Sequence, residues 1–409
     1  MTTPPASTIH DIAAAWLGRS AFAIVDLDAL ALNVEALRAH VGPGVQLMAV
    51  VKANGYGHGA VPIARAAIGA GASSLGVATV DEGAQLRRAG IDAPILVFGA
   101  VGRNERAQAI GHRLGVVVTN QEFARALAAE AKASLTKEPV PVHLKIDTGM
   151  RRFGAMPRDV PDLVRTIASL KELRLDGIMT HLASADADDP ASVTRQVAEF
   201  DRCLEALADS GLHIPIQHLA NSAATLRFPE FHRDMVRVGI VMYGLLPDVS
   251  IPLPKPMRPV LTVHGRITRV FDLFPGDQVG YGGTYRAAGN ERAALVPIGY
   301  ADGYRRGLSS RGWMSVRGQR ADVIGRVSMD QTVIRVPDGL TIEPGEPVVI
   351  AGDGTSATPG APTLDDLATL IDTIGYEMAS GLTSRLPRLY VRTGQLVAIA
   401  DLHGYRDLA

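Results

Sequence analysis

The chain has 409 residues, of which 47% are hydrophobic and 20% are charged, and its formal net charge is −1. This length suits two domains, and the apolar fraction is sufficient for a sizeable core without a disulfide or a metal staple. Because no stretch concentrates Lys and Arg, the composition argues against a nucleic acid or an anionic membrane as the main partner.

Nothing in the sequence indicates export or membrane insertion. Residues 1–20 lack a basic region followed by a long apolar one, so we expect no signal peptide. No run of about 18 apolar residues occurs, so we expect no membrane span. The single cysteine, Cys203, excludes an intrachain disulfide and fits a reducing compartment. We therefore expect a cytoplasmic protein.

The first half of the chain alternates short apolar runs with amphipathic segments. The apolar runs, rich in Val and Ile as buried parallel strands are, are Leu47–Val51, Ser74–Val80, Ile95–Gly99, Gly115–Thr119, Val140–Ile146, Gly177–His181, Ile216–Ala220 and Val236–Tyr243. Helix-like segments separate them, and Asp81 and Asn120 are candidate capping residues. Such a repeat over about 220 residues predicts a (β/α)8 barrel, with an open doubly wound sheet as the alternative. The earlier segment Ala21–Asp26 could pair with either half of the chain.

The pattern changes after Tyr243. Residues 247–259 hold five prolines and read as a linker. Short alternating strands with glycine turns follow, which predicts a mainly antiparallel domain. The predicted strands are Leu261–Phe271, Gln278–Tyr281, Ala293–Ile298, Met314–Val316, Val323–Ile324, Gln331–Val336, Val348–Ala351 and Arg388–Thr393. We thus expect a barrel over 27–255 and a β-rich domain over 256–409 that includes the segment 1–26.

In a barrel of parallel strands the reactive residues gather at the carboxyl ends of the strands. The first such end places Lys52 after an apolar strand and before a glycine-rich turn. Burial lowers the pKa of an ammonium group, as a Schiff-base lysine requires. The alternative is a lysine that leaves the barrel for solvent.

The later strand ends are also polar. Lys145–Gly154 surrounds one acid with cations, which suits a carboxylate anchor or a salt-bridged loop. His181 could be a base or a hydrogen-bonded structural residue. Asn221 and Ser222, with the strand end at Arg237–Ile240, could form a phosphate cup or simply cap their elements.

Taken together, these segments resemble the alanine racemase family. Ala49–Gly59 is similar to the family's attachment signature for pyridoxal 5'-phosphate (PLP). The resemblance continues, in family order, through Lys145–Gly154, Thr180–Ala183, Asn221–Ser222, Arg237–Gly244, Gly280–Tyr285, Gly299–Gly303, Arg326–Gln331 and Ile374–Glu377.

The resemblance implies a PLP enzyme that works as a head-to-tail homodimer with shared active sites. Lys52 matches the Schiff-base lysine and first base, and Tyr281 matches the second base, delivered from the partner subunit. Arg237 matches the partner of the pyridine nitrogen. The positions matching the remaining cofactor contacts are Tyr56, Asn221, Ser222, Gly239, Ile240 and Tyr376.

The remaining implied roles concern the substrate. Arg152 and Met329 match positions that hold the substrate carboxylate, and His181 matches a residue that supports the acid–base groups together with Arg152. Lys145 matches a lysine that is often carbamylated and then supports Arg152. The family link implies D-alanine for peptidoglycan, although a catabolic role is equally compatible. No metal is expected.

The sequence departs from the family pattern in three places. Arg151 stands where glycine is usual, which leaves the register of Arg151 and Arg152 uncertain. Gly55 replaces a common alanine, and Ser328 stands where cysteine is frequent.

Three alternatives stay open to different degrees. A barrel-type decarboxylase for basic amino acids would carry an acidic ring partner and a catalytic cysteine in its second domain. Here the ring position matches Arg237, and the only cysteine, Cys203, lies in the barrel half. A non-catalytic PLP carrier has the barrel alone. A racemase with a broader or serine preference is separated least well, because an apolar pocket discriminates by only about 1–3 kcal/mol per methylene.

Overall fold

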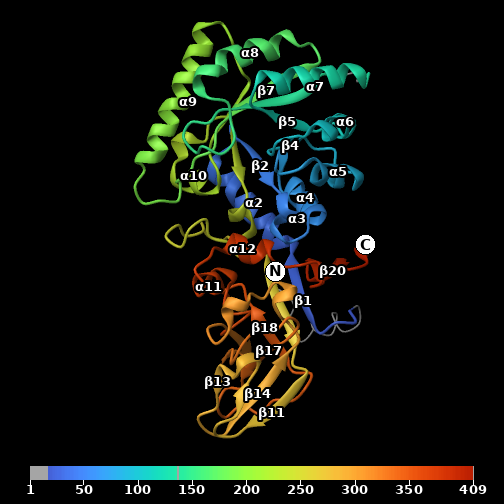
Figure 1. Cartoon of the computed structure of the whole chain (residues 1–409), viewed down its shortest axis with the longest axis vertical. Coiled ribbons are helices and arrows are strands. Elements are labelled where there is room, and N and C mark those ends of the chain that lie inside the picture. The colour runs from blue at the N-terminus through green and yellow to red at the C-terminus, as the bar shows by residue number, and fades with distance from the viewer. Residues whose placement is uncertain (1–16, 136–137, 409) are drawn as a thin grey trace.

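The computed structural model describes residues 17–135 and 138–408. Figure 1 shows two lobes stacked along the long axis, with the first half of the chain above and most of the second half below. Residues 1–16, on which the signal-peptide expectation mainly rests, lie outside the described part.

The upper lobe is the predicted barrel. Its strands are all parallel. From β2 to β8 each strand pairs with the next in chain order, and β9 pairs with β2. They are β2 (Gln46–Val50), β3 (Ser74–Val77), β4 (Ile95–Val97), β5 (Gly115–Val118), β6 (Val140–Lys145), β7 (Leu173–Met179), β8 (Ile216–His218) and β9 (Met235–Val238). Hydrogen bonds from Asp234 N to Gln217 O and from Arg237 N to Ala220 O link the flanks of β8 and β9. The ring is therefore nearly closed, and the prediction of a barrel over an open sheet is confirmed.

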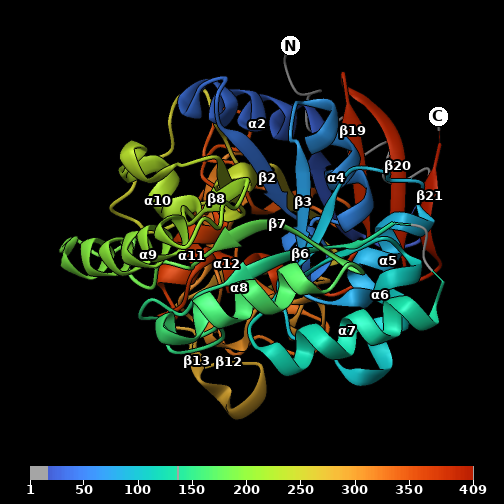
Figure 2. The same ribbon diagram turned by 90° about the horizontal axis from the view of Figure 1, so that it is seen from above.

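Helices surround these strands, as Figure 2 shows from above. They are α2 (Leu27–Val41), α3 (Lys52–Tyr56), α4 (Ala60–Gly69), α5 (Val80–Arg88), α6 (Arg106–Gly111), α7 (Gln121–Ala133), α8 (Val160–Ser169), α9 (Ala191–Asp209) and α10 (Ser222–Arg227). Asn120 caps α7 as predicted. The capping prediction for Asp81 is wrong, because the Thr79 side chain and Glu82 form a reciprocal capping box two residues earlier.

The lower lobe is mainly antiparallel, as predicted. Its large sheet has the order β16-β15-β18-β10-β1-β19-β20-β21, in which β1 is Ala21–Asp26, β10 Leu261–Arg266, β15 Trp313–Val316, β16 Gln319–Asp322, β18 Pro347–Ala351, β19 Arg388–Arg392, β20 Gln395–Asp401 and β21 Gly404–Asp407. Smaller sheets contain β11 (Arg269–Leu273), β12 (Gln278–Val279), β13 (Tyr285–Arg286), β14 (Glu291–Val296) and β17 (Thr332–Arg335), and two short helices are α11 (Leu364–Thr369) and α12 (Gly375–Ser380). The segment whose pairing the sequence left open, β1, lies between β10 and β19.

Predicted and observed strands differ clearly at two places in the lower lobe and at the last strand of the barrel. Leu261–Phe271 is two strands in separate sheets, because the chain changes partners where Arg266 N bonds Ser20 O and Thr268 N bonds Leu295 O. Val323–Ile324 forms only a single bridge, from Val323 to Ile334. The strand predicted to reach Tyr243 ends at Val238, because Gly239 leaves the extended conformation and a 3-10 turn follows over Ile240–Tyr243.

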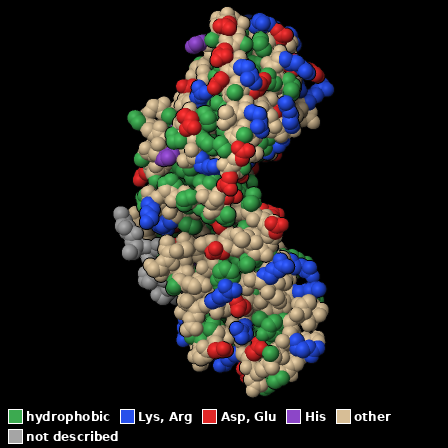
Figure 3. All heavy atoms as spheres, turned by 90° about the vertical axis from the view of Figure 1, so that its left-hand side faces the viewer, with side chains coloured by type: hydrophobic (Ala, Val, Ile, Leu, Met, Phe, Trp, Pro, Cys, Tyr) green, Lys and Arg blue, Asp and Glu red, His purple; other side chains and the backbone are tan. Residues whose placement is uncertain are grey.

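The surface matches the low net charge. Figure 3 shows acidic and basic side chains interspersed over one face, and the outline is indented between the two lobes. Within the described residues, none of the helices is both long enough and apolar enough to cross a membrane.

Candidate active site

A cavity of about 420 Å³ opens at the carboxyl ends of the barrel strands. It brings together most of the residues that the sequence singled out, from five of the eight strand ends and from α12. These are Lys52, Tyr56, Lys145, Arg152, His181, Asn221, Ser222, Arg237, Gly239, Ile240 and Tyr376. Arg152 rather than Arg151 lines the cavity. Arg151 is 63% exposed and lies 3.9 Å from the carboxylate of Asp147.

Lys52 follows β2 directly and begins an unusual turn. Ala53, Asn54, Gly55 and Tyr56 all have positive φ values between 51° and 62°. Each non-glycine residue in this left-handed region costs roughly 1–2 kcal/mol, so the turn requires support from its surroundings. Burial lowers the pKa of the Lys52 ammonium, the nearby Arg152 lowers it further, and Glu82 opposes both effects.

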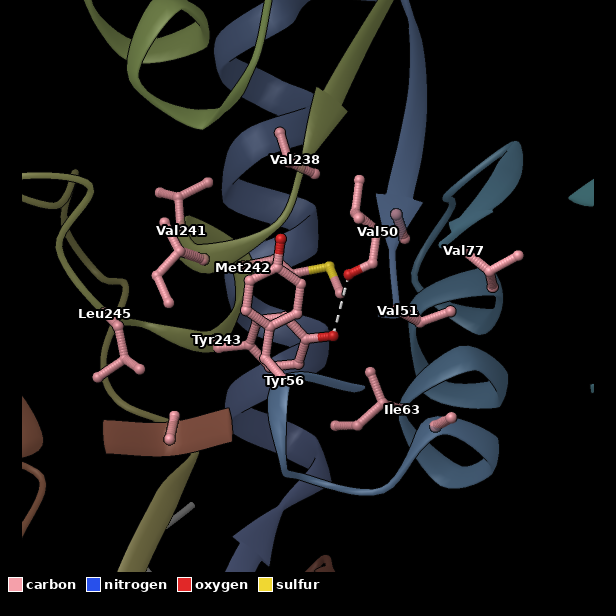
Figure 4. Packing of buried hydrophobic residues seen from close by; sticks show 14 of the residues in the cluster. Val50, Val51, Tyr56, Ile63, Val77, Val238, Val241, Met242, Tyr243 and Leu245 are labelled. Carbon is pink, nitrogen blue, oxygen red and sulfur yellow. Dashed lines mark hydrogen bonds between the residues drawn. The ribbon is translucent and has the colours of Figure 1, made fainter. Parts of the chain in front are cut away.

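Tyrosine rings pack beneath this turn (Figure 4). The Tyr243 hydroxyl donates to Val50 O at 3.1 Å, and the Tyr56 ring lies 5.0 Å from the Tyr243 ring, centroid to centroid. The Tyr376 ring approaches Tyr56 from the second lobe at 6.2 Å. These contacts fix the end of β2 and join the two lobes at the cavity.

Arg237 is a buried cation whose two terminal nitrogens face several acceptors. Its guanidinium donates to the carbonyl oxygens of Thr180, His218 and Leu219 at 2.8–3.2 Å. It also contacts Nδ1 of both His218 and His181 at 3.2 Å. Burial lowers the pKa of Arg237 to about 9, so the group still carries a proton at neutral pH.

The cavity wall is strongly cationic. Burial lowers the pKa of Lys145 to about 8, and the neighbouring Arg237 and Arg152 act in the same direction. The pKa of His181 lies well below its ordinary value because of burial and the same cations. A site that concentrates positive charge in this way favours an anionic ligand.

A small cradle forms where β9 ends. The Gly239 backbone N–H donates to the Ser222 hydroxyl at 2.9 Å, and Asn221 caps α10 through Ala224 N. A side chain on Gly239 would place Cβ 2.5 Å from the Tyr56 hydroxyl oxygen. Only glycine therefore fits between Tyr56 and this backbone.

Two of the singled-out residues do not join the cavity. Tyr281 and Met329 lie on loops of the second lobe, where they are 70% and 51% exposed. Tyr300 and Met329 lie on neighbouring loops, joined by hydrogen bonds from Tyr300 N to Ser328 O and from Ala301 N to Met329 O. One chain alone does not bring Tyr281 to Lys52.

Sequence reasoning did not assign roles to three polar residues that border the site. The Glu82 carboxylate accepts from Ala53 N at 2.7 Å, and His218 and His143 form a buried pair beneath Arg237. The position of His218 at a strand end was a usable signal. For Glu82 and His143 the linear sequence held none, because their contacts are made across strands.

Comparison with known proteins gives a consistent result. Family models described as the N-terminal and C-terminal domains of alanine racemase match residues 25–247 and 260–390. An alanine racemase from Symbiobacterium thermophilum is 43% identical over 373 residues, covering 91% of this chain and 97% of that protein. One from Nostoc sp. is 41% identical over 379 residues, covering 92% and 97%.

Solved structures agree. The crystal structure of alanine racemase from Bacillus anthracis with bound L-Ala-P has a TM-score of 0.86 at 34% identity and covers 94% of this chain and 98% of that one. Alanine racemase from Streptomyces coelicolor A3(2) also has a TM-score of 0.86, at 39% identity, with coverages of 91% and 98%. The fold, the site and these similarities define an isomerase of the amino-acid racemase class. The chain belongs to the alanine racemase family.

Proposed function

We propose that the chain interconverts L-alanine and D-alanine with PLP as cofactor, using Lys52 and the partner subunit's Tyr281 as the two bases. The observation that carries this proposal is the convergence of Lys52, Arg237 and Ser222 on one cavity, in a chain of this family. A racemase with a broader or serine preference is the second candidate.

The residues present fit PLP. A lysine of lowered pKa suits reaction with an aldehyde. The cradle of Ser222 and Gly239, which has no room for a larger residue, suits a phosphate. We assign the phosphate side of the cofactor to Tyr56, Asn221, Ser222, Gly239, Ile240 and Tyr376, and the pyridine nitrogen to Arg237.

Racemisation requires proton transfer on two opposite sides of the α-carbon. When bound, PLP supplies the sink for the electrons that proton removal releases. Lys52 Nζ serves one side, and burial lowers its pKa toward the range in which it can accept a proton. The phenol of the partner subunit's Tyr281 serves the other side, tuned by Arg152 and His181.

Arg237 influences the chemistry because it gives no proton to the pyridine nitrogen. A guanidinium only donates hydrogen bonds, and the protein already supplies this one with carbonyl acceptors. It therefore leaves the pyridine nitrogen without a proton, which weakens the electron sink and disfavours side reactions. We assign the substrate carboxylate to Arg152 and Met329, and a supporting role to Lys145 in its carbamylated form.

The shared site requires a homodimer. Tyr281, Tyr300 and Met329 are all exposed on the second lobe, and large exposed apolar side chains are typical of interaction surfaces. The Tyr281 loop packs on Arg326, close to the Met329 loop. We propose that this face covers the cavity of the partner subunit.

We also propose the division into a barrel, 27–255, and a β-rich domain, 256–409 with 1–26, since β1 pairs with β10 and β19. A cytoplasmic location is proposed because Cys203, the single cysteine, is buried. The product D-alanine would supply peptidoglycan.

The experiment that tests the function is D-alanine formation from L-alanine by the purified, PLP-loaded protein. Serine, lysine and arginine are run alongside under the same conditions. Fast conversion of alanine alone is the expected result. Faster conversion of another amino acid would keep the chemistry and replace the substrate, and no conversion of any would overturn the proposal.

A further inference from the structure

The turn that follows Lys52 is held by contacts from outside itself. Three of its residues, Ala53, Asn54 and Tyr56, are L-residues in the left-handed region, where steric contact of Cβ with the backbone strains each of them. Such a conformation persists only where neighbouring groups determine it. Because Lys52 precedes the turn directly, the direction of its side chain depends on how the turn is anchored.

Glu82 supplies an anchor from the adjacent strand-helix unit. One carboxylate oxygen accepts from Ala53 N at 2.7 Å. The other accepts from Ala78 N at 2.7 Å and from Thr79 N at 3.2 Å, at the end of β3. A single carboxylate therefore joins the turn after β2 to the turn after β3, and each of these bonds is charge-assisted.

A second anchor comes from the other lobe. The Arg388 guanidinium, only 3% exposed, donates to Gly57 O at 2.8 Å. It also donates to the carbonyl oxygens of Leu382, Thr383 and Leu386. Glu82 and Arg388 thus hold the two ends of the same turn from opposite directions.

We propose that Glu82 is a positioning residue for Lys52: its carboxylate stabilises the left-handed turn through Ala53 N and thereby sets the orientation and reactivity of the lysine amine. The inference deepens the proposed function, on which its importance for PLP rests. The contacts of Glu82 with the turn after Lys52 are observed in the structure and do not depend on that function.

The charge of Glu82 adds an electrostatic effect. The polar and charged groups that face Lys52 from the surrounding elements are Tyr56, Glu82, Lys145, Arg152, His181 and Arg237. Among these, Glu82 is the group that raises the pKa of Lys52, while Arg152 and Arg237 lower it. Loss of the carboxylate charge therefore favours the neutral amine.

The test compares Glu82→Gln with two matched controls in the full-length chain. The glutamine keeps the size of the side chain but presents an NH2 group to backbone donors that need an acceptor. Thr79→Ala removes the other half of the same capping box, the Thr79 hydroxyl that accepts from Glu82 N, without touching Ala53. Glu105→Gln removes a similar carboxylate cap, on Gly102 N, in another loop.

The first measurement is the pH profile of Lys52 modification by an amine-reactive reagent in PLP-free protein, read by peptide mass spectrometry. Only the neutral amine reacts, so Glu82→Gln is expected to move the midpoint to lower pH, while both controls keep the parent midpoint. The second measurement is the affinity of the full-length protein for PLP, determined by fluorescence. We expect roughly tenfold weaker binding for Glu82→Gln, the equivalent of about 1.4 kcal/mol.

A rescue variant separates positioning from general stability. Adding Ala53→Gly to Glu82→Gln should recover part of the PLP affinity, because glycine adopts positive φ without the steric cost. An unchanged labelling midpoint in Glu82→Gln, with stability lowered only as much as in Thr79→Ala, would overturn the inference and leave Glu82 as a helix cap. A failure of the proposed function would give a different result, because the Lys52→Ala variant would then still bind PLP.

Discussion

Nδ1 of His143 lies 2.8 Å from Nε2 of His218 in the barrel core. The other ring nitrogen of His218 contacts Nη1 of Arg237 at 3.2 Å. Because a guanidinium only donates, Nδ1 of His218 accepts, and its Nε2 must carry the proton and donate to His143. The pair therefore fixes one tautomer of His218 and turns an acceptor toward Arg237.

This relationship predicts that His218→Leu weakens cofactor binding. The substitution removes one of the two acceptors of Arg237 Nη1, which keeps its bond to the backbone oxygen of residue 218. It also leaves Nδ1 of His143 without its buried partner, and an unpaired buried polar group costs about 1–3 kcal/mol. We expect a lower free energy of unfolding and a PLP dissociation constant raised roughly tenfold, measured by denaturation and by fluorescence titration. His213→Leu, at an exposed position, is the control and should leave PLP affinity unchanged. An unaltered affinity in His218→Leu would show that Arg237 holds its place through the carbonyl oxygens alone.

The separation of Tyr281 from Lys52 within one chain predicts complementation between subunits. Tyr281→Phe should lose racemisation but keep PLP, because Tyr281 is 70% exposed in its own chain and lies outside the cavity. Lys52→Ala should lose both activity and the visible absorbance of bound PLP. Mixing the two inactive chains should restore up to about a quarter of the parent activity, since half of the random dimers are mixed and each has one intact site. No recovery after verified subunit exchange would exclude a shared site.

Buried neutral histidines predict a loss of stability in mild acid. Burial lowers the pKa of His58 to about 4, whereas an unfolded histidine titrates near 6.5. The unfolded chain therefore binds more protons between these values, and this contribution is constant above pH 6.5 and is lost as pH falls toward 4. Between pH 7 and pH 5, His58 should account for about 2 kcal/mol of the fall in unfolding free energy.

The matched variant is His58→Asn, whose amide can replace the ring N–H that donates to Tyr56 O but does not titrate. Chemical denaturation at both pH values should show a pH-dependent loss smaller by that amount in the variant. The same loss in both proteins would contradict the assignment to His58.

Lys145 is expected to react with carbon dioxide. Because the pKa of Lys145 is about 8, a substantial fraction of its amine is neutral near pH 8. A carbamate on this amine would place an anion beside Arg152 and Arg237. Adding ¹³C-labelled bicarbonate should give a carbamate signal by NMR that is absent from Lys145→Met. That variant should also raise KM for alanine about tenfold, because Arg152 loses a charged partner. Lys171→Met, at an exposed position, should change neither the signal nor KM.

The sequence determined much of this protein by itself. The repeat of short Val- and Ile-rich runs predicted the barrel. Parallel strands are buried on both faces, so each appears in the sequence as a continuous apolar run and can be recognised without knowledge of its neighbours. The polar residues that end those runs, Lys52, His181, Ser222 and Arg237 among them, predicted one site because the carboxyl ends of barrel strands converge. The structure brings these four to one cavity.

Only the tertiary structure decided the remaining relationships, because they depend on contacts between distant segments. The pairing of β1 with β10 and β19 follows from the complete sheet. The left-handed turn after Lys52 receives hydrogen bonds from Glu82 and Arg388 in other segments, whereas local propensity favours other conformations for Ala53 and Tyr56. The exposure of Tyr281 is likewise decided by the orientation of the second lobe, which no pattern within the Gly280–Tyr285 segment encodes.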